Sequence, residues 1–325
     1  MYNMDKYSNS TTVTEFFLTG FPGVSPEFYP AVGLLLLFIY LVLALGNIFT
    51  IAFVFYEKNL QKPVYLIFCN LAAVDFAFGT ATMPKIVGKY LISDDNISFY
   101  ACFIQMYLIH YLGTVTSFLL LVMAIDRFIA ICNPLRYPTI VTNQSAAVIC
   151  LIFWIFPGLW MVLIVYQSIS LPYCNSNIIQ HCFCDRTSIT KLACSDITVP
   201  QTYAFVGAMV TLLGPLAFIL SSYVSIIIAV FKISNAQGKY KTFSTCSPQL
   251  LIICLYYLPR CAVYVLDVTV QMKIDARIMI VIWYSLFPPL VNPMIFCFRT
   301  KEIREAFLMK LRKSKISHKR TAPSG

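Results

Sequence analysis

The chain has 325 residues, of which 59% are apolar and only 12% are charged, and it carries a formal net charge of +10. A soluble globular protein has about half apolar residues and about a quarter charged residues, so this composition excludes that class. The same figures exclude a disordered chain, a collagen and a small disulfide scaffold.

Seven apolar blocks follow one another along the chain, each long enough to supply the about 20 residues that cross a bilayer. We therefore predict an all-α membrane protein, a bundle of seven transmembrane helices over residues 31–298. Residues 1–30 form a tail before the bundle, and residues 299–325 follow it. The blocks begin near Ala31, Val64, Ala101, Ala146, Tyr203, Leu250 and Ile274.

The basic residues predict how the bundle is oriented. Most of the 24 Lys and Arg residues fall at 58–62, 127–136, 232–241 and 299–320, and basic residues in short loops stay on the cytoplasmic side. This places the N-terminus outside the cell and the chain in the plasma membrane as a multi-pass protein. The positive charge is then a topology signal, and no nucleic-acid partner is expected.

Glycosylation sequons agree with this orientation. Asn9 and Asn96 each begin an Asn-X-Ser/Thr sequence in a segment placed outside, and we expect both to carry carbohydrate. Asn143 begins a third such sequence, but it falls in a segment placed inside and is not expected to be modified.

Five of the 12 cysteines lie at or beyond the outer ends of the predicted helices, where thiols can be oxidised. Spacing alone does not choose among their pairings. His181, Cys182 and Cys184 also offer three metal ligands in four residues, but in a cysteine-rich loop of the secretory pathway we favour disulfides and expect no metal. The five are Cys102, Cys174, Cys182, Cys184 and Cys194.

Polar residues inside the apolar blocks require an explanation, because a charge in the bilayer is costly. Asp75 lies midway along the second block, and Asn47 and Asn292 lie in the first and seventh. They could form one network that ties helices together. Asp75 is either a hydrogen-bonded structural group or a cation or proton site, and we favour the second interpretation, with sodium as a possible ion. The prolines of the later blocks are expected to bend their helices. They are Pro157, Pro215, Pro248, Pro259 and Pro293.

Asp126 and Arg127 are adjacent where the third block meets the cytoplasm. Such a pair can be an interfacial ion pair whose side chains reach water. It can also be a switch, in which Arg127 is held by Asp126 in one state and released in another.

The run MAIDRFIAICNPLRYP at 123–138 resembles the hallmark stretch of the olfactory receptors, a branch of the rhodopsin-like G-protein-coupled receptors. Further motifs of that family follow in order over about residues 25 to 312, and Pro259 in the sixth block is similar to a fish-type branch. These motifs are Gly46-Asn47, Pro63-Val64-Tyr65, Asp75, Ser222-Tyr223, the run KTFSTC at 241–246 and Asn292-Pro293.

The resemblance implies two disulfides, Cys102 with Cys184 and Cys174 with Cys194. Cys182 is then the odd thiol, and a swap to Cys102 with Cys182 stays open. The chain also departs from the family pattern at Thr116, where many olfactory receptors carry Glu, so an ion site with two carboxylates is in doubt.

The resemblance further implies a small-molecule pocket that opens to the outside between helices. Two interpretations explain His110 equally well, a buried imidazole or a residue that contacts the ligand. Arg260 suits a carboxylate or sulfate ligand if it faces inward, which we favour, and reaches headgroups if it faces outward. The expected pocket residues are His110, Gly113, Thr114, Tyr257, Arg260 and Tyr264.

The mechanism implied is a population shift, in which ligand binding swings the sixth helix outward and opens a groove for a heterotrimeric G protein. Arg127 and Tyr223 would line this groove. After the seventh helix, Ile303, Phe307 and Leu311 recur at helical spacing and predict a short amphipathic helix on the inner leaflet. The expected switch residues are Asp126, Arg127, Tyr223, Asn292 and Pro293.

Three other classes of protein compete with this interpretation. An ion-coupled transporter or channel could use Asp75, but seven helices do not divide into two inverted halves. A membrane enzyme is not expected, because His110 and His181 stand apart from any acid pair or metal-binding helix motif. A rhodopsin-like receptor with a non-odorant role remains an alternative.

Overall fold

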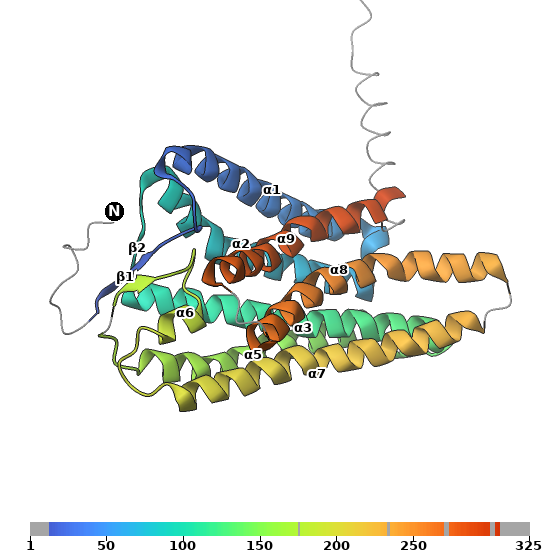
Figure 1. Ribbon diagram of the computed structural model, residues 1–325. Coiled ribbons are helices and arrows are strands. Elements are labelled where there is room, and N and C mark those ends of the chain that lie inside the picture. The colour runs from blue at the N-terminus through green and yellow to red at the C-terminus, as the bar shows by residue number, and fades with distance from the viewer. Residues whose placement is uncertain (1–12, 175, 233–234, 270–272, 300–302, 306–325) are drawn as a thin grey trace, which may run out of the picture.

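The computed structural model describes residues 13–174, 176–232, 235–269, 273–299 and 303–305. Within these residues, seven helices are long and apolar enough to cross a membrane, as predicted. Figure 1 shows them lying side by side as a bundle. They are α1 (Tyr29–Tyr56), α2 (Pro63–Ile92), α3 (Phe99–Cys132), α5 (Asn143–Ile169), α7 (Thr198–Phe231), α8 (Ala236–Thr269) and α9 (Ile274–Arg299).

Short elements connect these helices, and three of them form a small sheet at one end of the bundle. Strand β1 (Glu15–Leu18) is central, with β2 (Asn96–Ser98) antiparallel on one side and β3 (Ile178–Ile179) parallel on the other. We call this end the strand end, and the other the opposite end. The remaining short elements are the 3₁₀ turns η2 (Pro26–Phe28) and η3 (Lys58–Leu60) and the helices α4 (Tyr137–Ile140) and α6 (Arg186–Thr190).

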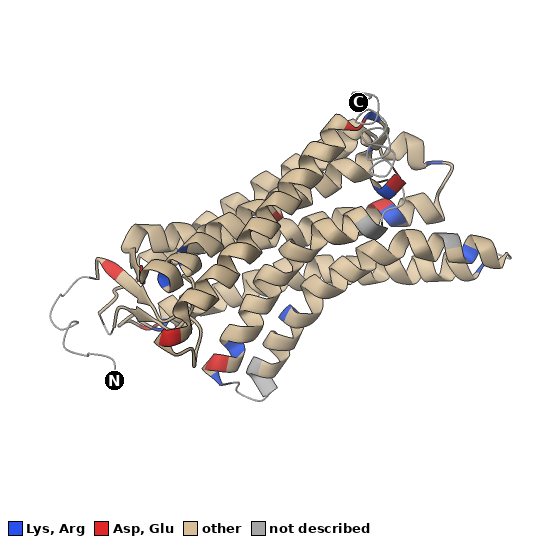
Figure 2. Ribbon diagram, turned by 90° about the horizontal axis from the view of Figure 1, so that it is seen from above, with Lys and Arg blue, Asp and Glu red and all other residues tan. Residues whose placement is uncertain are grey.

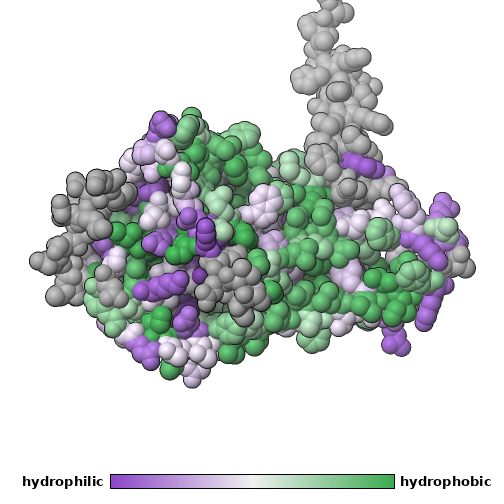
Figure 3. Space-filling view, in the orientation of Figure 1, coloured by the Kyte–Doolittle hydropathy of each residue, from purple (hydrophilic) through white to green (hydrophobic). Residues whose placement is uncertain are grey.

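Charged residues gather at the two ends of the bundle, and the length between them is almost free of charge (Figure 2). The space-filling view shows the same division, with hydrophilic residues near both ends and hydrophobic residues between them (Figure 3). Many large apolar side chains of α1, α5 and α7 are exposed, among them Leu45, Leu159 and Phe218. A lipid surround accounts for this exposure, because apolar surface of this extent is not stable in water.

Two helices begin well before their apolar blocks. The sequence places the start of the sixth block near Leu250, but α8 begins at Ala236, and α7 begins at Thr198 rather than near Tyr203. Hydropathy marks the membrane-embedded length of a helix and not its ends, because polar turns outside the lipid remain helical when water satisfies their side chains. All five prolines named above lie inside helices, and the ribbon of α8 changes direction along its length (Figure 1).

The predicted amphipathic helix after α9 is described only in part. Residues 303–305 are helical and Ile303 is buried. Phe307 and Leu311 lie outside the described residues.

Helix α3 is the centre of the bundle, where it packs against α2, α5, α7 and α8. Its side chains Val115, Leu119 and Leu120 are fully buried. A hydrogen bond of 2.9 Å from the indole nitrogen of Trp154 to Oδ1 of Asn70 joins α5 to α2 behind it. Such buried polar bonds fix how apolar helices are rotated against one another in lipid.

Helices α1 and α2 approach closely at Gly79. A Cβ atom placed on Gly79 would lie 2.6 Å from Cδ2 of Leu43, and Leu43 is itself fully buried. Small residues at such crossings let helix backbones meet and gain dispersion contacts in a membrane.

We therefore expect Gly79→Ala to lower the Tm of the detergent-purified receptor. Overpacking costs about 1–3 kcal/mol, more than the about 0.5–1 kcal/mol gained by replacing a helical glycine with alanine. Gly214→Ala is the matched control, because a Cβ there meets nothing within 4 Å. Equal Tm values for the two variants would contradict the close approach of α1 and α2.

Candidate functional site

A cavity lies inside the bundle between α2, α3, α8 and α9. Its volume of about 20 Å³ is enough for a water molecule or a small ion. Of the predicted pocket residues, Gly113 and Arg260 lie on its wall, together with Asp75 and Asn292. A Cβ atom on Gly113 would meet no heavy atom within 4 Å, so the space beside it is open.

The wall also contains residues that the sequence analysis did not single out. They share the cavity because they face it from the same turns of α8 and α9 as the predicted residues. Tyr256 precedes Arg260 by four positions, a spacing that puts both on one helix face and was the available signal. The additional polar residues are Tyr256, Tyr284 and Ser285.

Asp75 is hydrogen-bonded to α9 at the floor of this cavity. The amide nitrogen of Asn292 donates to Oδ2 of Asp75 at 2.7 Å, and both residues are buried. Asn47 belongs to the same junction but does not bond to either side chain. Its amide donates to the carbonyl oxygen of Leu43 at 2.9 Å and to that of Pro289 at 3.0 Å. Helix α9 is thus tied to α2 through Asp75 and to α1 through Asn47.

Arg260 faces inward. Its guanidinium carbon lies 3.8 Å from the ring centroid of Tyr256 and 4.4 Å from that of Tyr284. One guanidinium nitrogen, Nη1, donates to the carbonyl oxygen of Tyr256 at 3.0 Å. Two aromatic rings from two helices therefore hold the cation by its faces, an arrangement that attracts a charge electrostatically.

Three other predicted pocket residues, His110, Thr114 and Tyr257, do not line this cavity. Tyr257 is buried between α8 and α3, where its hydroxyl and that of Ser117 are hydrogen-bonded at 2.7 Å. Thr114 donates to the carbonyl oxygen of His110 within α3. Nε2 of His110 has no hydrogen-bond partner among the described residues. The side chain of Tyr264 lies outside the described residues.

At the opposite end, Asp126 contacts two partners. Nε of Arg127 lies 3.5 Å from Oδ2 of Asp126, and the hydroxyl of Tyr137 donates to Oδ1 at 2.8 Å. Tyr137, on α4, was not predicted, although it lies in the hallmark run that carries the family resemblance. Tyr223 is buried on α7, and its hydroxyl has no partner among the described residues. The Asp126 carboxylate is thus in contact with both Arg127 and Tyr137.

Two disulfides lie at the strand end, joining Cys102 to Cys184 and Cys174 to Cys194. These are the pairs that the resemblance implies, and Cys182 is a buried free thiol. The metal site considered for His181, Cys182 and Cys184 would need Cys184 as a thiolate, but Cys184 is in a disulfide. The described residues contain no group of three or more His, Cys, Asp or Glu side chains arranged to hold a metal ion.

The loop between α5 and α7 is connected to the bundle core as well as to the disulfides. The backbone nitrogen of Cys184 donates to Oε1 of Gln105 at 3.0 Å, and Nε2 of Gln105 donates to the carbonyl oxygen of Ala81 at 2.8 Å. Arg186 is buried and donates to Ser168 and to the carbonyl oxygen of Pro200. The loop between α5 and α7 is therefore held in place over the strand end, and we call this loop the cover.

His181 belongs to this cover and is 3% exposed. Its Nδ1 accepts a long hydrogen bond from the backbone nitrogen of Phe183, and its Nε2 has no partner among the described residues. Burial lowers the pKa of His181 below the ordinary imidazole value, although nearby Asp185 acts in the other direction. The imidazole of His181, buried in this loop, is therefore neutral at neutral pH.

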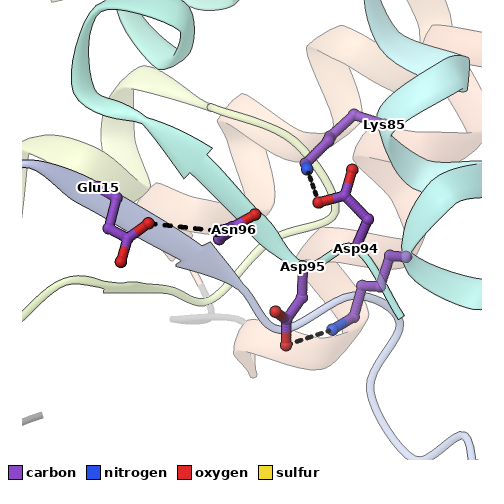
Figure 4. Close-up of polar contacts among 6 residues, drawn as sticks. Glu15, Lys85, Asp94, Asp95 and Asn96 are labelled. Atoms are coloured by element: carbon purple, nitrogen blue, oxygen red, sulfur yellow. Dashed lines mark hydrogen bonds and ion pairs between the residues drawn. The ribbon is translucent and has the colours of Figure 1, made fainter. Parts of the chain in front are cut away.

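Ion pairs hold the connection between α2 and β2 (Figure 4). Nζ of Lys85 lies 2.6 Å from Asp94, and Nζ of Lys89 lies 3.9 Å from Asp95. Asn96 is exposed on β2, where its amide donates to Glu15 on β1 at 3.2 Å. The sequon at Asn96 is thus on the surface, whereas Asn9 lies outside the described residues.

The fold is that of a rhodopsin-like seven-helix receptor. Squid rhodopsin superposes with a TM-score of 0.70 over 88% of this chain and 81% of that one, at 18% sequence identity. The family model for olfactory receptors matches residues 36–314. Human olfactory receptor 2AT4 is 35% identical over 90% of this chain and 91% of its own length, and mouse olfactory receptor 1M1 is 33% identical over 95% and 98%.

The chain belongs to the olfactory receptor family. It is an odorant G-protein-coupled receptor, a multi-pass protein of the plasma membrane, and not an enzyme. The family implies a small odorant ligand and coupling to a G protein. No finding favours the transporter or channel alternative.

The neutral state of His181 predicts a pH dependence of stability. Because its pKa is lowered in the folded state, the unfolded chain takes up a proton more readily below about pH 6.5, and stability is lost as the pH falls through that range. We expect acidification from about pH 7.5 to about pH 5.5 to lower the Tm of the wild type more than that of His181→Gln.

Thermal unfolding of the two purified receptors at both pH values measures this difference. The other titratable groups are common to both proteins, so their effects cancel. Parallel Tm losses in the wild type and His181→Gln would contradict a role for His181.

Proposed function

We propose that the strand end faces outside the cell and admits the odorant, and that the opposite end receives the G protein. The distribution of basic residues supports this orientation, because cytoplasmic loops retain Lys and Arg. Exposed Asn96 and the sequon at Asn9 are then carbohydrate sites on the outer side. The two disulfides at the strand end agree with an oxidising compartment.

The odorant site extends along α3 and α8 toward the cavity. His110, Gly113 and Thr114 supply its α3 side, and Tyr257, Arg260 and Tyr264 its α8 side. Gly113 leaves open space beside the cavity, and Nε2 of His110 is available to a polar ligand group. The observation that carries this proposal is the inward guanidinium of Arg260, which favours odorants with a carboxylate or sulfate group.

Coupling to the G protein uses the opposite end. Asp126 holds Arg127 in the closed bundle, and Tyr137 holds Asp126. A ligand that prefers an outward position of α8 shifts the population toward an open groove lined by Arg127 and Tyr223. Asn292 and Pro293 on α9 belong to the same switch, because Asn292 bonds to Asp75 and Pro293 packs near Gly46 of α1.

Odorant responses of a cell line that expresses the receptor and a stimulatory olfactory G protein test this proposal. The panel is divided into acids, amines, neutral volatiles and amino acids, and cAMP is measured beside ion flux. Arg260→Ala is expected to reduce potency toward acidic agonists by about tenfold or more, since a charged hydrogen bond contributes about 1.5–3 kcal/mol. Arg260→Lys, which keeps the charge but not the planar fork, is expected to lose less.

Surface expression, measured in parallel, separates lost binding from lost protein. Unchanged potency of acidic agonists on Arg260→Ala would remove Arg260 from the odorant site. Odorant-gated ion flux without a cAMP response would contradict G-protein coupling.

A further inference from the structure

The cavity contains one acid and one base. Among the described residues that line it, Asp75 and Arg260 are the charged ones, and they approach it from α2 and α8. They do not form a direct ion pair, because no described carboxylate lies within 4.0 Å of the Arg260 guanidinium. The cavity wall therefore carries one acidic and one basic side chain that are not within ion-pair distance of each other.

Arg260 is fixed in this position by contacts from two helices. Tyr256 of α8 and Tyr284 of α9 place their rings 3.8 and 4.4 Å from the guanidinium carbon, and the carbonyl oxygen of Tyr256 accepts from Nη1. The rings stabilise the cation but do not neutralise it. Its nearest source of negative charge on the cavity wall is Asp75, and such an interaction is screened little in the bilayer interior.

The cavity does not suit a sodium ion, contrary to the expectation raised by Asp75 alone. Asp75 Oδ2 already accepts from Asn292 at 2.7 Å. Thr116 donates its hydroxyl proton to the carbonyl oxygen of Leu112 and, unlike a carboxylate at this position, brings no second negative charge to the cavity. Oxygen ligands are present on the wall, since Oδ1 of Asn292 is buried without a hydrogen-bond partner among the described residues. A cation entering a space of about 20 Å³ would be repelled by Arg260 on the same wall, so the charge of Arg260 excludes it.

We propose that Arg260 is the built-in counterion of Asp75, so that this receptor keeps its membrane cavity neutral without an inorganic cation. The arrangement links α8 electrostatically to α2, and through Asn292 to α9. The counterion proposal rests on the proposed function in one respect only. If Arg260 also receives an acidic odorant, that anion competes with Asp75 for the guanidinium and releases α8 from the link.

Thermal unfolding of the purified receptor in sodium chloride and in N-methyl-D-glucamine chloride of equal ionic strength tests the proposal without any odorant. The wild type is expected to show the same Tm in both salts. Arg260→Gln removes the built-in cation, and we expect its Tm to be roughly 2 °C or more higher in sodium than in the organic cation. Adding Asp75→Asn to Arg260→Gln is expected to abolish this sodium effect.

Arg260→Lys is the matched variant that keeps the charge, and its Tm is expected to be insensitive to sodium like that of the wild type. If Arg260→Gln does not fold, the wild type and Arg260→Lys still decide the question, because sodium stabilisation of either protein overturns the proposal. Equal Tm values for Arg260→Gln in both salts would also overturn it. These outcomes do not depend on odorant binding or G-protein coupling, so they are distinguishable from a failure of the proposed function.

Discussion

The arrangement of this receptor depends on one constraint, that a polar group carried into the lipid is costly unless it finds a partner inside the bundle. The bond from Asn292 to Asp75 is its clearest expression, since it joins the middle of α2 to the later part of α9. Asn47 then attaches α9 to α1 through the carbonyl oxygen of Pro289. Apolar contacts alone would leave the rotation of these helices weakly determined, because lipid competes equally for their surfaces.

The same constraint connects the cover at the strand end to the core. Cys102 anchors the loop between α5 and α7 to the top of α3 through Cys184. Gln105, one turn further along α3, bonds to the backbone of Cys184 and to that of Ala81 on α2. The cover is therefore connected to α2 and α3 together. These helices also carry Asp75 and the Asp126–Arg127 pair.

Much of this was predictable from the sequence, because length and hydropathy determine how many helices cross a membrane. Asp75, Asn292 and Arg127 were identifiable for the same reason, as costly groups in apolar blocks. The early start of α8 at Ala236 was not predictable, since polar helical turns outside the lipid leave no hydropathy signal. The four-residue spacing predicts that Tyr256 and Arg260 share one face of α8, but that this face meets Tyr284 depends on how α8 is rotated against α9 and was not predictable.

The central claim is that an odorant at the strand end changes the opening at the opposite end. Spin labels can be attached to genetically encoded unnatural amino acids at Val148 of α5 and Phe243 of α8. Both residues are exposed and lie near the opposite end of the bundle, so the distance between the labels reports that opening directly. The account predicts that an agonist odorant shifts the measured distance distribution toward longer values in step with nucleotide exchange on the G protein. An unchanged distribution under conditions where the odorant drives full nucleotide exchange would contradict it.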